Sequence, residues 1–132
     1  MNAPNSLSLC VASPMVQRTL RLAAIACCVA IAVLSLLPGD ARPHTGFPGK
    51  LEHFVAYAGT GLVFALGCFE PRRRLAFWLG LGIASGLFEV LQNFVPGRSP
   101  SVFDALASIL GLSCGLLAGV AVAGSLNRPT QA

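Results

Sequence analysis

The sequence predicts an all-α integral membrane protein that crosses the bilayer four times and keeps both termini in the cytoplasm. Of its 132 residues, 55% are hydrophobic and only 11% are charged, and the mean hydropathy is +0.72. About a quarter of an ordinary globular sequence is charged, so this chain lacks the polar side chains that cover a water-facing surface. A membrane-spanning helix takes about 20 apolar residues, so the chain has room for four or five spans and none for a soluble catalytic domain.

Four long apolar stretches mark the predicted spans. The first follows a polar tail (residues 1–17) and ends at Pro38, because the Pro-Gly pair there cannot continue a helix. We expect this stretch to stay uncleaved, since its apolar run is long and no small-residue cleavage site follows it. The spans are expected at residues 19–37, 51–69, 75–94 and 102–126, within one domain of residues 18–126 that precedes a tail of residues 127–132.

Basic residues beside the spans indicate their orientation. Six would lie on one side of the membrane and three on the other: Arg18, Arg21, Arg72, Arg73, Arg74 and Arg128, against Arg42, Lys50 and Arg98. Loops rich in arginine and lysine stay in the cytoplasm, so this excess places both termini and the arginine triplet inside.

Polar residues from distant parts of the sequence then meet at the outer side. Lys50, His53 and Tyr57 follow an i, i+3, i+7 spacing, which puts them on one stripe of the second span. Arg98 precedes the fourth span on the same side, and Asp104 lies in its first turn. We therefore expect a polar cluster at the outer membrane surface.

The third span adds a second polar stripe, formed by Ser85, Glu89 and Gln92. Glu89 lies several residues before the helix-ending Pro96, about a turn or more below the interface. An unpaired carboxylate is costly at that depth, so Glu89 should face the interior of the bundle and have a partner.

Glycines at helical spacing predict close packing between spans. In the fourth span they follow Asp104 and Ser108 at intervals of three and four residues, and the third span carries a pair of the same spacing. Glycine removes the side-chain barrier between helices, so such faces approach closely. The residues assigned to helix packing are Gly82, Gly86, Gly111, Gly115 and Gly119.

The same polar residues carry a family resemblance. The pattern is Lys50-x-x-His53-Phe54-x-x-Tyr57, then Glu89-x-x-Gln92-x-x-x-Pro96-Gly97-Arg98-x-x-Ser101-x-x-Asp104, then Gly111-x-x-x-Gly115. It resembles the signature of VanZ-like membrane proteins over about half of the chain, roughly Lys50 to Gly119. The family pattern commonly has an acidic residue before the lysine and an asparagine four residues after the aspartate. This chain has Gly49 and Ser108 there, so a role that needs a carboxamide at residue 108 is in doubt.

The resemblance implies a multi-pass protein of the bacterial cytoplasmic (inner) membrane, in a family named after a member associated with resistance to the glycopeptide teicoplanin. It implies no established reaction. The first functional hypothesis is that this chain is an envelope protein that binds the polar or anionic headgroup of an amphiphile, such as a lipid-linked cell-wall precursor or a glycopeptide. The candidate ligand-binding residues are Lys50, His53, Tyr57, Glu89, Gln92, Arg98, Ser101, Asp104 and Ser108.

Two other function classes stay open. An intramembrane enzyme could use His53 with Glu89 or Asp104 as acid and base, although no nucleophile elbow, HExxH motif or phosphate loop accompanies them. A small transporter or membrane assembly subunit is the third class. Four helices from one chain would line a pathway only as a homo-oligomer, and the polar residues stop near one surface.

Several of these residues also have purely structural interpretations. Ser101-x-x-Asp104 before an apolar run is a capping-box pattern, so Asp104 can simply satisfy the first turn of the fourth span. Arg98 can be an interfacial charge or the counter-ion of Glu89. Tyr57 and Trp78 suit bilayer anchors, and Lys50 can extend toward lipid headgroups.

The sequence argues against nucleic acid and against a cofactor. The net charge of +4 comes from arginines beside apolar segments, which orient membrane helices and do not track phosphates. His53, Glu89 and Asp104 could together hold a divalent ion. We expect no metal there, because a lone histidine is a weak zinc signal and Arg98 should compete for both acids.

Overall fold

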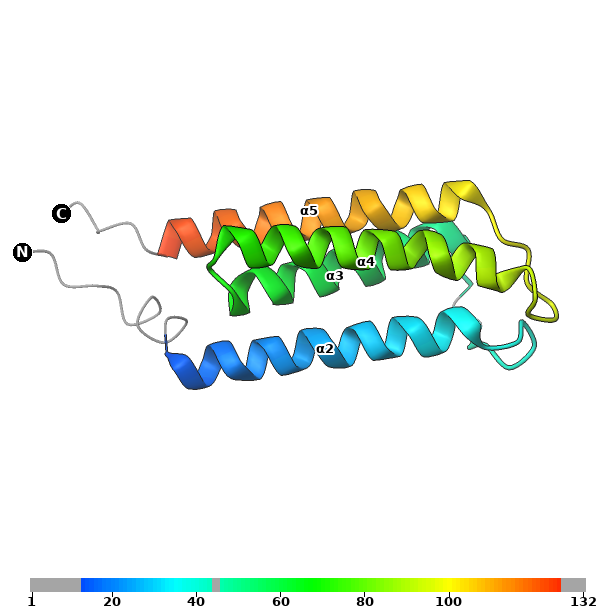
Figure 1. Cartoon of the computed structure of the whole chain (residues 1–132), viewed down its shortest axis with the longest axis horizontal. Helices are drawn as coiled ribbons and strands as arrows, with labels where there is room; N and C mark the ends of the chain where they lie inside the picture. Colours follow the sequence, from blue (N-terminus) through cyan, green and yellow to red (C-terminus); the bar gives the residue numbers. More distant parts are fainter. Residues whose placement is uncertain (1–12, 44–45, 127–132) are drawn as a thin grey trace, which may run out of the picture.

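The computed structural model describes residues 13–43 and 46–126, and within them the chain forms four helices and no strand. The helices are α2 (Pro14–Leu36), α3 (Gly49–Gly67), α4 (Pro71–Gln92) and α5 (Val102–Leu126). The all-α prediction with four helices is confirmed. The helices alternate in direction and lie roughly along one long axis (Figure 1).

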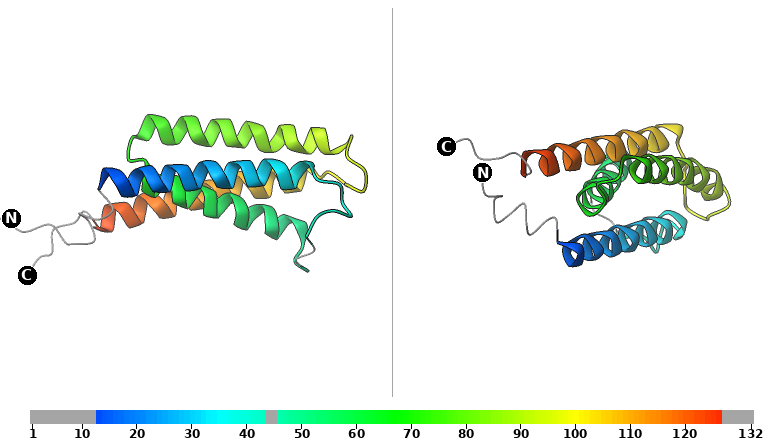
Figure 2. Two further views of the ribbon diagram at one scale, coloured as in Figure 1. Left: turned by 90° about the horizontal axis from the view of Figure 1, so that it is seen from below. Right: turned by 60° about the vertical axis from the view of Figure 1, so that its left-hand side comes forward.

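One end of this bundle collects the polar residues. It is formed by the C-terminal ends of α2 and α4, the N-terminal ends of α3 and α5, and the two segments that connect them (Figures 1 and 2). The segment of residues 37–48 joins α2 to α3, and that of residues 93–101 joins α4 to α5. The opposite end holds the short α3–α4 turn and the far ends of α2 and α5. We call the first end the polar end.

The helix boundaries differ from the prediction most clearly at the arginine triplet. We expected Arg72–Arg74 to form a loop, but α4 begins at Pro71, whose fixed φ angle suits the first helical position. Arg74 donates through Nε to the carbonyl oxygen of Cys68 (2.6 Å) and through Nη2 to that of Ala65 (2.8 Å). These bonds satisfy the last carbonyl groups of α3, so the triplet belongs to the α3–α4 corner.

The bundle buries several polar residues beside its apolar core and exposes many large apolar side chains. Apart from Leu81, the buried residues of α4 are Ser85, Glu89 and Gln92. Large apolar side chains are exposed along all four helices, among them Leu87 and Leu117. The exposed faces thus differ from those of a water-soluble bundle, which are polar.

Three helices, α2, α4 and α5, are long and apolar enough to cross a membrane. The composition of α3 does not meet the same criterion, although its 19 residues match a predicted span in length. The reason lies in its first turns, which contain Lys50, Glu52 and His53. The span expected at residues 51–69 therefore stays a prediction.

The closest helix contact joins α3 to α5. A Cβ atom built on Gly111 or Gly115 of α5 would overlap the backbone carbonyl of Phe54 or Ala58 of α3. Gly119 continues the same row, where a Cβ would lie 2.6 Å from that of Ala65. The three glycines therefore allow backbone-to-backbone contact along the length of α3.

The glycine pair of α4 does not form a comparable contact. A Cβ on Gly86 would meet nothing within 4 Å, and one on Gly82 would only touch Ile109 at 4.0 Å. α4 instead approaches α5 through side chains, with Trp78 donating from Nε1 to Ser113 Oγ over 2.9 Å. The packing role that we expected for Gly82 and Gly86 is not found, because spacing alone does not tell which face of a helix meets its neighbour.

Candidate functional site

Three helices each contribute one titratable side chain to a common point at the polar end. His53 comes from α3, Glu89 from α4 and Asp104 from α5. A ring nitrogen of the histidine and one oxygen of each carboxylate lie within 4.8 Å of one another. The antiparallel order of the helices places these residues at the same depth, although they are far apart in sequence.

The His53 ring is held by Ser108. Its Nδ1 lies 3.2 Å from Ser108 Oγ, and the hydroxyl group donates to the carbonyl oxygen of Asp104 (2.9 Å). When the hydroxyl proton is donated to Asp104, Oγ is left as an acceptor for His53, which favours the tautomer with the ring proton on Nδ1. In the neutral ring, Nε2 then keeps its lone pair. Ser108, with 1% of its surface exposed, is thus a buried group that contacts the His53 ring.

Glu89 is 8% exposed and accepts a hydrogen bond from the backbone N–H of Ser101 over 2.9 Å. In a capping box this N–H would bond to the side chain of Asp104. Ser101 does cap α5, since its Oγ accepts from the N–H of Phe103 (3.3 Å). Glu89 therefore replaces Asp104 in the reciprocal half of the capping box, and the Asp104 carboxylate is not used there.

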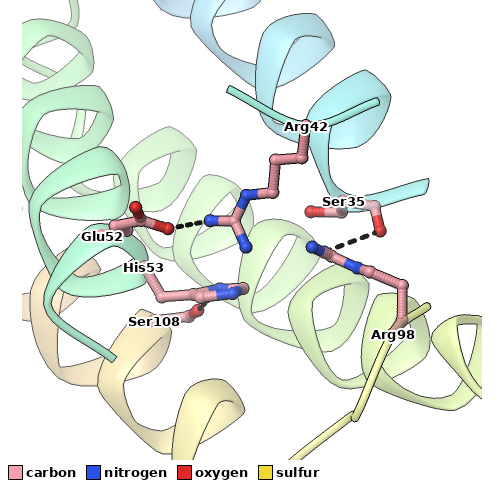
Figure 3. A network of polar contacts seen from close by, with 6 residues as sticks. All are labelled: Ser35, Arg42, Glu52, His53, Arg98 and Ser108. Carbon is pink, nitrogen blue, oxygen red and sulfur yellow. Dashed lines mark hydrogen bonds and ion pairs between the residues drawn. The ribbon is translucent and has the colours of Figure 1, made fainter. Parts of the chain in front are cut away.

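Arg98 does not pair with either acid of this cluster. Its Nη2 donates to the carbonyl oxygen of Ser35 at the end of α2 (3.1 Å; Figure 3). Burial and repulsion from Arg42 lower the pKa of the Arg98 guanidinium below its usual range. The interpretation of Arg98 as the counter-ion of Glu89 is not found in the structure.

A second arginine, which the sequence analysis did not select, lies beside Arg98. Arg42 forms an ion pair with Glu52, and its side chain extends toward the His53 ring (Figure 3). The sequence did contain a signal for this pair. Arg42 and Glu52 have opposite charges and both lie near the start of the span predicted at residues 51–69. Ser35 could not be found in this way, because it contributes only its backbone carbonyl.

The ion pairs in the described part of the chain leave both site acids without a basic partner. Those pairs are Arg42–Glu52 and Arg73–Glu70, and the second lies at the α3–α4 corner. Glu89 and Asp104 thus lie close to each other, and no arginine or lysine of residues 13–43 and 46–126 lies within ion-pair distance of them. Lys50 instead lies over the ring of Phe103, with Nζ 4.8 Å from the ring centre.

Two pockets adjoin at the polar end. The polar pocket, of about 540 Å³, is lined by both interhelix segments and by the ends of α3, α4 and α5. The apolar pocket, of about 160 Å³, lies between α2 and α3 and reaches Ile31, Leu34 and Ala56. Arg42, His53 and Arg98 line both pockets.

The other candidate residues divide between these pockets. Six predicted ligand-binding residues line the polar pocket: Lys50, His53, Gln92, Arg98, Ser101 and Asp104. Tyr57 is 2% exposed and lines the apolar pocket, so it lies inside the bundle and is not a bilayer anchor. Glu89 and Ser108 line neither pocket. They contact residues that do: Glu89 accepts a hydrogen bond from Ser101, and Ser108 contacts His53.

Comparison with protein-family models, with curated proteins and with solved structures finds no match to this chain.

Proposed function

We propose that this chain is an integral membrane protein that binds the polar or anionic headgroup of an amphiphile. One observation carries the proposal: a polar pocket and an apolar pocket adjoin and share Arg42, His53 and Arg98. A molecule with a charged head and an apolar tail is complementary to such a pair of pockets, because each part finds groups of its own kind.

The distribution of polar and apolar residues supports a membrane location. Three helices are long and apolar enough to span a bilayer, and large apolar side chains are exposed on all four. We propose that α3 also crosses the membrane, which gives the chain four spans. In this topology the polar end is outside and both termini are in the cytoplasm. The glycine contact of α3 with α5, which runs from Phe54 to Ala65, and the contacts of α3 with α2 support a fourth span, since they pack α3 against helices that are apolar enough to span a bilayer.

The arginines of the pocket favour an acceptor-rich headgroup. Arg98 Nε is buried and has no hydrogen-bond partner among the described residues, and its Nη2 is held in place by Ser35. A phosphate, carboxylate or carbonyl oxygen would supply the missing acceptor. The guanidinium group is thus already oriented for an anion before any ligand arrives.

The resemblance to VanZ-like proteins supports a particular class of amphiphile. Residues of the quoted pattern line the polar pocket, among them Lys50, His53, Gln92, Arg98 and Asp104. We therefore propose a protein of the bacterial cytoplasmic membrane whose ligand is a lipid-linked cell-wall precursor or a glycopeptide of the teicoplanin type.

Direct binding tests this proposal. The purified full chain in detergent is titrated with a short-chain, polyprenyl diphosphate-linked cell-wall precursor and with teicoplanin, and binding is followed by microscale thermophoresis. Arg98→Gln should weaken binding by about tenfold or more, since it removes a charge-assisted hydrogen bond. Arg72→Gln, at the opposite end of the bundle, is the matched control and should bind as the native chain does. Equal affinities for Arg98→Gln and the native chain would refute a headgroup site at Arg98.

A cellular assay addresses the role of the buried acid. Glu89→Gln keeps the shape of the side chain and removes its charge. It should abolish the envelope phenotype, for example altered glycopeptide susceptibility, while the protein still accumulates in the membrane. Loss of accumulation with normal activity per molecule would instead assign Glu89 a structural role only.

A further inference from the structure

We propose that His53, Glu89 and Asp104 bind a divalent transition-metal ion such as Zn²⁺ or Mn²⁺. The proposal goes beyond headgroup binding and does not depend on it, because it concerns the protein and the ion alone. It rests on the donor set, on the charge of the cluster, on the groups that orient the donors, and on one buried amide beside them.

The donor set suits such an ion. His53 Nε2 carries a free lone pair, because Nδ1 holds the ring proton against Ser108. One oxygen from each of Glu89 and Asp104 lies within 4.8 Å of the histidine and of the other carboxylate. Atoms bound to one ion at about 2.0–2.2 Å are at most about 4.4 Å apart, so small side-chain rotations close the site. An imidazole with two carboxylates is a ligand set for borderline cations.

The charge of the cluster calls for a cation. Glu89 is 8% exposed, and its carboxylate lies next to that of Asp104. Neither has an arginine or lysine within ion-pair distance in the part of the chain that the structure describes. Two carboxylates repel strongly where water is scarce, and a divalent ion between them turns this repulsion into attraction.

Two hydrogen bonds orient the donors from outside the cluster. Ser108 Oγ binds the far nitrogen of the His53 ring, and the Ser101 N–H binds Glu89 Oε2. Protein metal sites hold histidine and carboxylate ligands in this way, since outer partners fix the ring orientation and the direction of each lone pair. Glu89 uses Oε2 and His53 uses Nδ1 for these two bonds.

A buried amide gives an independent observation that points to a ligand. Gln92 lies one turn after Glu89 on α4, is 3% exposed and lines the polar pocket beside His53 and Asp104. Its Nε2 has no hydrogen-bond partner among the described residues, and a buried donor without an acceptor is costly. An oxygen bound to the ion, from water or from a ligand, would accept this hydrogen bond. Three protein ligands leave a coordination position open for that oxygen.

The structure also removes the main sequence-based objection to a metal. We expected Arg98 to compete for both acids, but its guanidinium donates to Ser35 and forms no ion pair with them. Arg42 is likewise engaged by Glu52. Neither arginine therefore forms an ion pair with Glu89 or Asp104.

Metal uptake by the full chain tests the proposal. The purified protein is prepared in detergent without an affinity tag and with its cysteines replaced by alanine, because thiols are soft ligands for zinc. After chelator treatment it is dialysed against Zn²⁺ and, separately, Mn²⁺, and bound metal is measured by mass spectrometry of the elements. We expect one ion per chain. No uptake of either metal above the level of a chelator-saturated sample would overturn the proposal without any variant.

Variants then locate the ion. Glu89→Gln and Asp104→Asn should each lower the affinity by about 100-fold, and Ser108→Ala by about 10- to 100-fold, because it frees the ring that it orients. Glu70→Gln is the matched control: it removes a carboxylate at the opposite end of the bundle and should bind the metal like the parent. If an acid variant does not fold, the metal affinity of Ser108→Ala still tests the site, since Ser108 is not itself one of the proposed ligands. Equal affinity in parent and Ser108→Ala, or equal losses in cluster and control variants, would refute this site. Headgroup binding by a metal-free chain would separate the two proposals.

Discussion

Arg98 and Ser35 are joined by a hydrogen bond between a guanidinium nitrogen and a backbone carbonyl, across 63 positions of sequence. The bond ties the α4–α5 segment to the end of α2. A second link lies next to it, where the N–H of Gly39 donates to the carbonyl oxygen of Pro96 over 3.1 Å. The φ angle of Gly97 is +71°, a conformation that favours glycine, and it turns the chain toward Gly39. The two segments that cover the polar end therefore form one connected layer.

Arg98→Lys should loosen this layer. Lysine places a single ammonium group where the guanidinium carries several donors, so the bond to Ser35 is lost or weakened. We expect a loss of about 1–2 kcal/mol in stability, as for other hydrogen bonds of charged groups. Thermal unfolding in detergent measures the loss, and hydrogen exchange should rise at the Gly39 amide. Arg72→Lys serves as the control and should leave both measurements unchanged; faster exchange in that variant as well would count against a local effect.

Replacing glycine by alanine should lower the stability of the chain at Gly115 and raise it at Gly86, although both glycines belong to pairs of the same sequence spacing. Gly115→Ala places a Cβ against the Ala58 carbonyl group and should destabilise the chain by about 3 kcal/mol, because backbone atoms cannot move aside cheaply. Gly86→Ala meets nothing within 4 Å and should stabilise α4 by up to about 1 kcal/mol through helix propensity. Thermal melts of both variants in the same detergent compare them. A Gly115→Ala protein as stable as the native one would mean that α3 and α5 are farther apart.

The pairing of charges at the polar end can be measured with double-mutant cycles. Arg42 and Glu52 form a partly buried ion pair, so the cycle built from Arg42→Gln and Glu52→Gln should give a coupling energy of about 1 kcal/mol. The cycle for Arg98 and Glu89 should give a smaller value, because these residues do not touch. The reverse order would restore Arg98 as the counter-ion of Glu89.

Labelling of single cysteines tests the proposed orientation. In a cysteine-free background, Asp40→Cys reports on the polar end and Arg72→Cys on the α3–α4 corner. A membrane-impermeant maleimide should label position 40 in intact cells and position 72 only after the cells are opened, since arginine-rich turns stay in the cytoplasm. Labelling of position 72 in intact cells would invert the topology.

The four helices were predictable because each contains a long apolar run near a proline or glycine, although α3 begins with polar turns. Their ends were less so. Pro71 and the bonds of Arg74 to α3 extend α4 back over the arginine triplet, and these tertiary bonds leave no trace in the hydropathy pattern. The depth of the polar residues followed from the alternating helix directions, which is why His53, Glu89 and Asp104 were placed at one end.

The partners of these side chains were harder to predict. Arg98 binds a backbone carbonyl of α2, and its direction depends on the turn at Gly97, which sequence spacing does not reveal. Glu89 takes the N–H that a capping box would assign to Asp104, because α4 brings its carboxylate to the start of α5. Both differences arise from the path of the α4–α5 segment, where no helical periodicity constrains the chain.

The contact between α3 and α5 also bears on how the chain enters the membrane during synthesis. The first turns of α3 are polar, so in the proposed topology this helix gains little from entering lipid by itself. The glycine face that receives it belongs to α5, which is synthesised after α3 and α4. Insertion of α3 should therefore be completed only after α5 has been made. A chain that stops after Phe69 would expose α3 to aqueous labelling reagents, whereas full protection of α3 in that fragment would show that it inserts unaided.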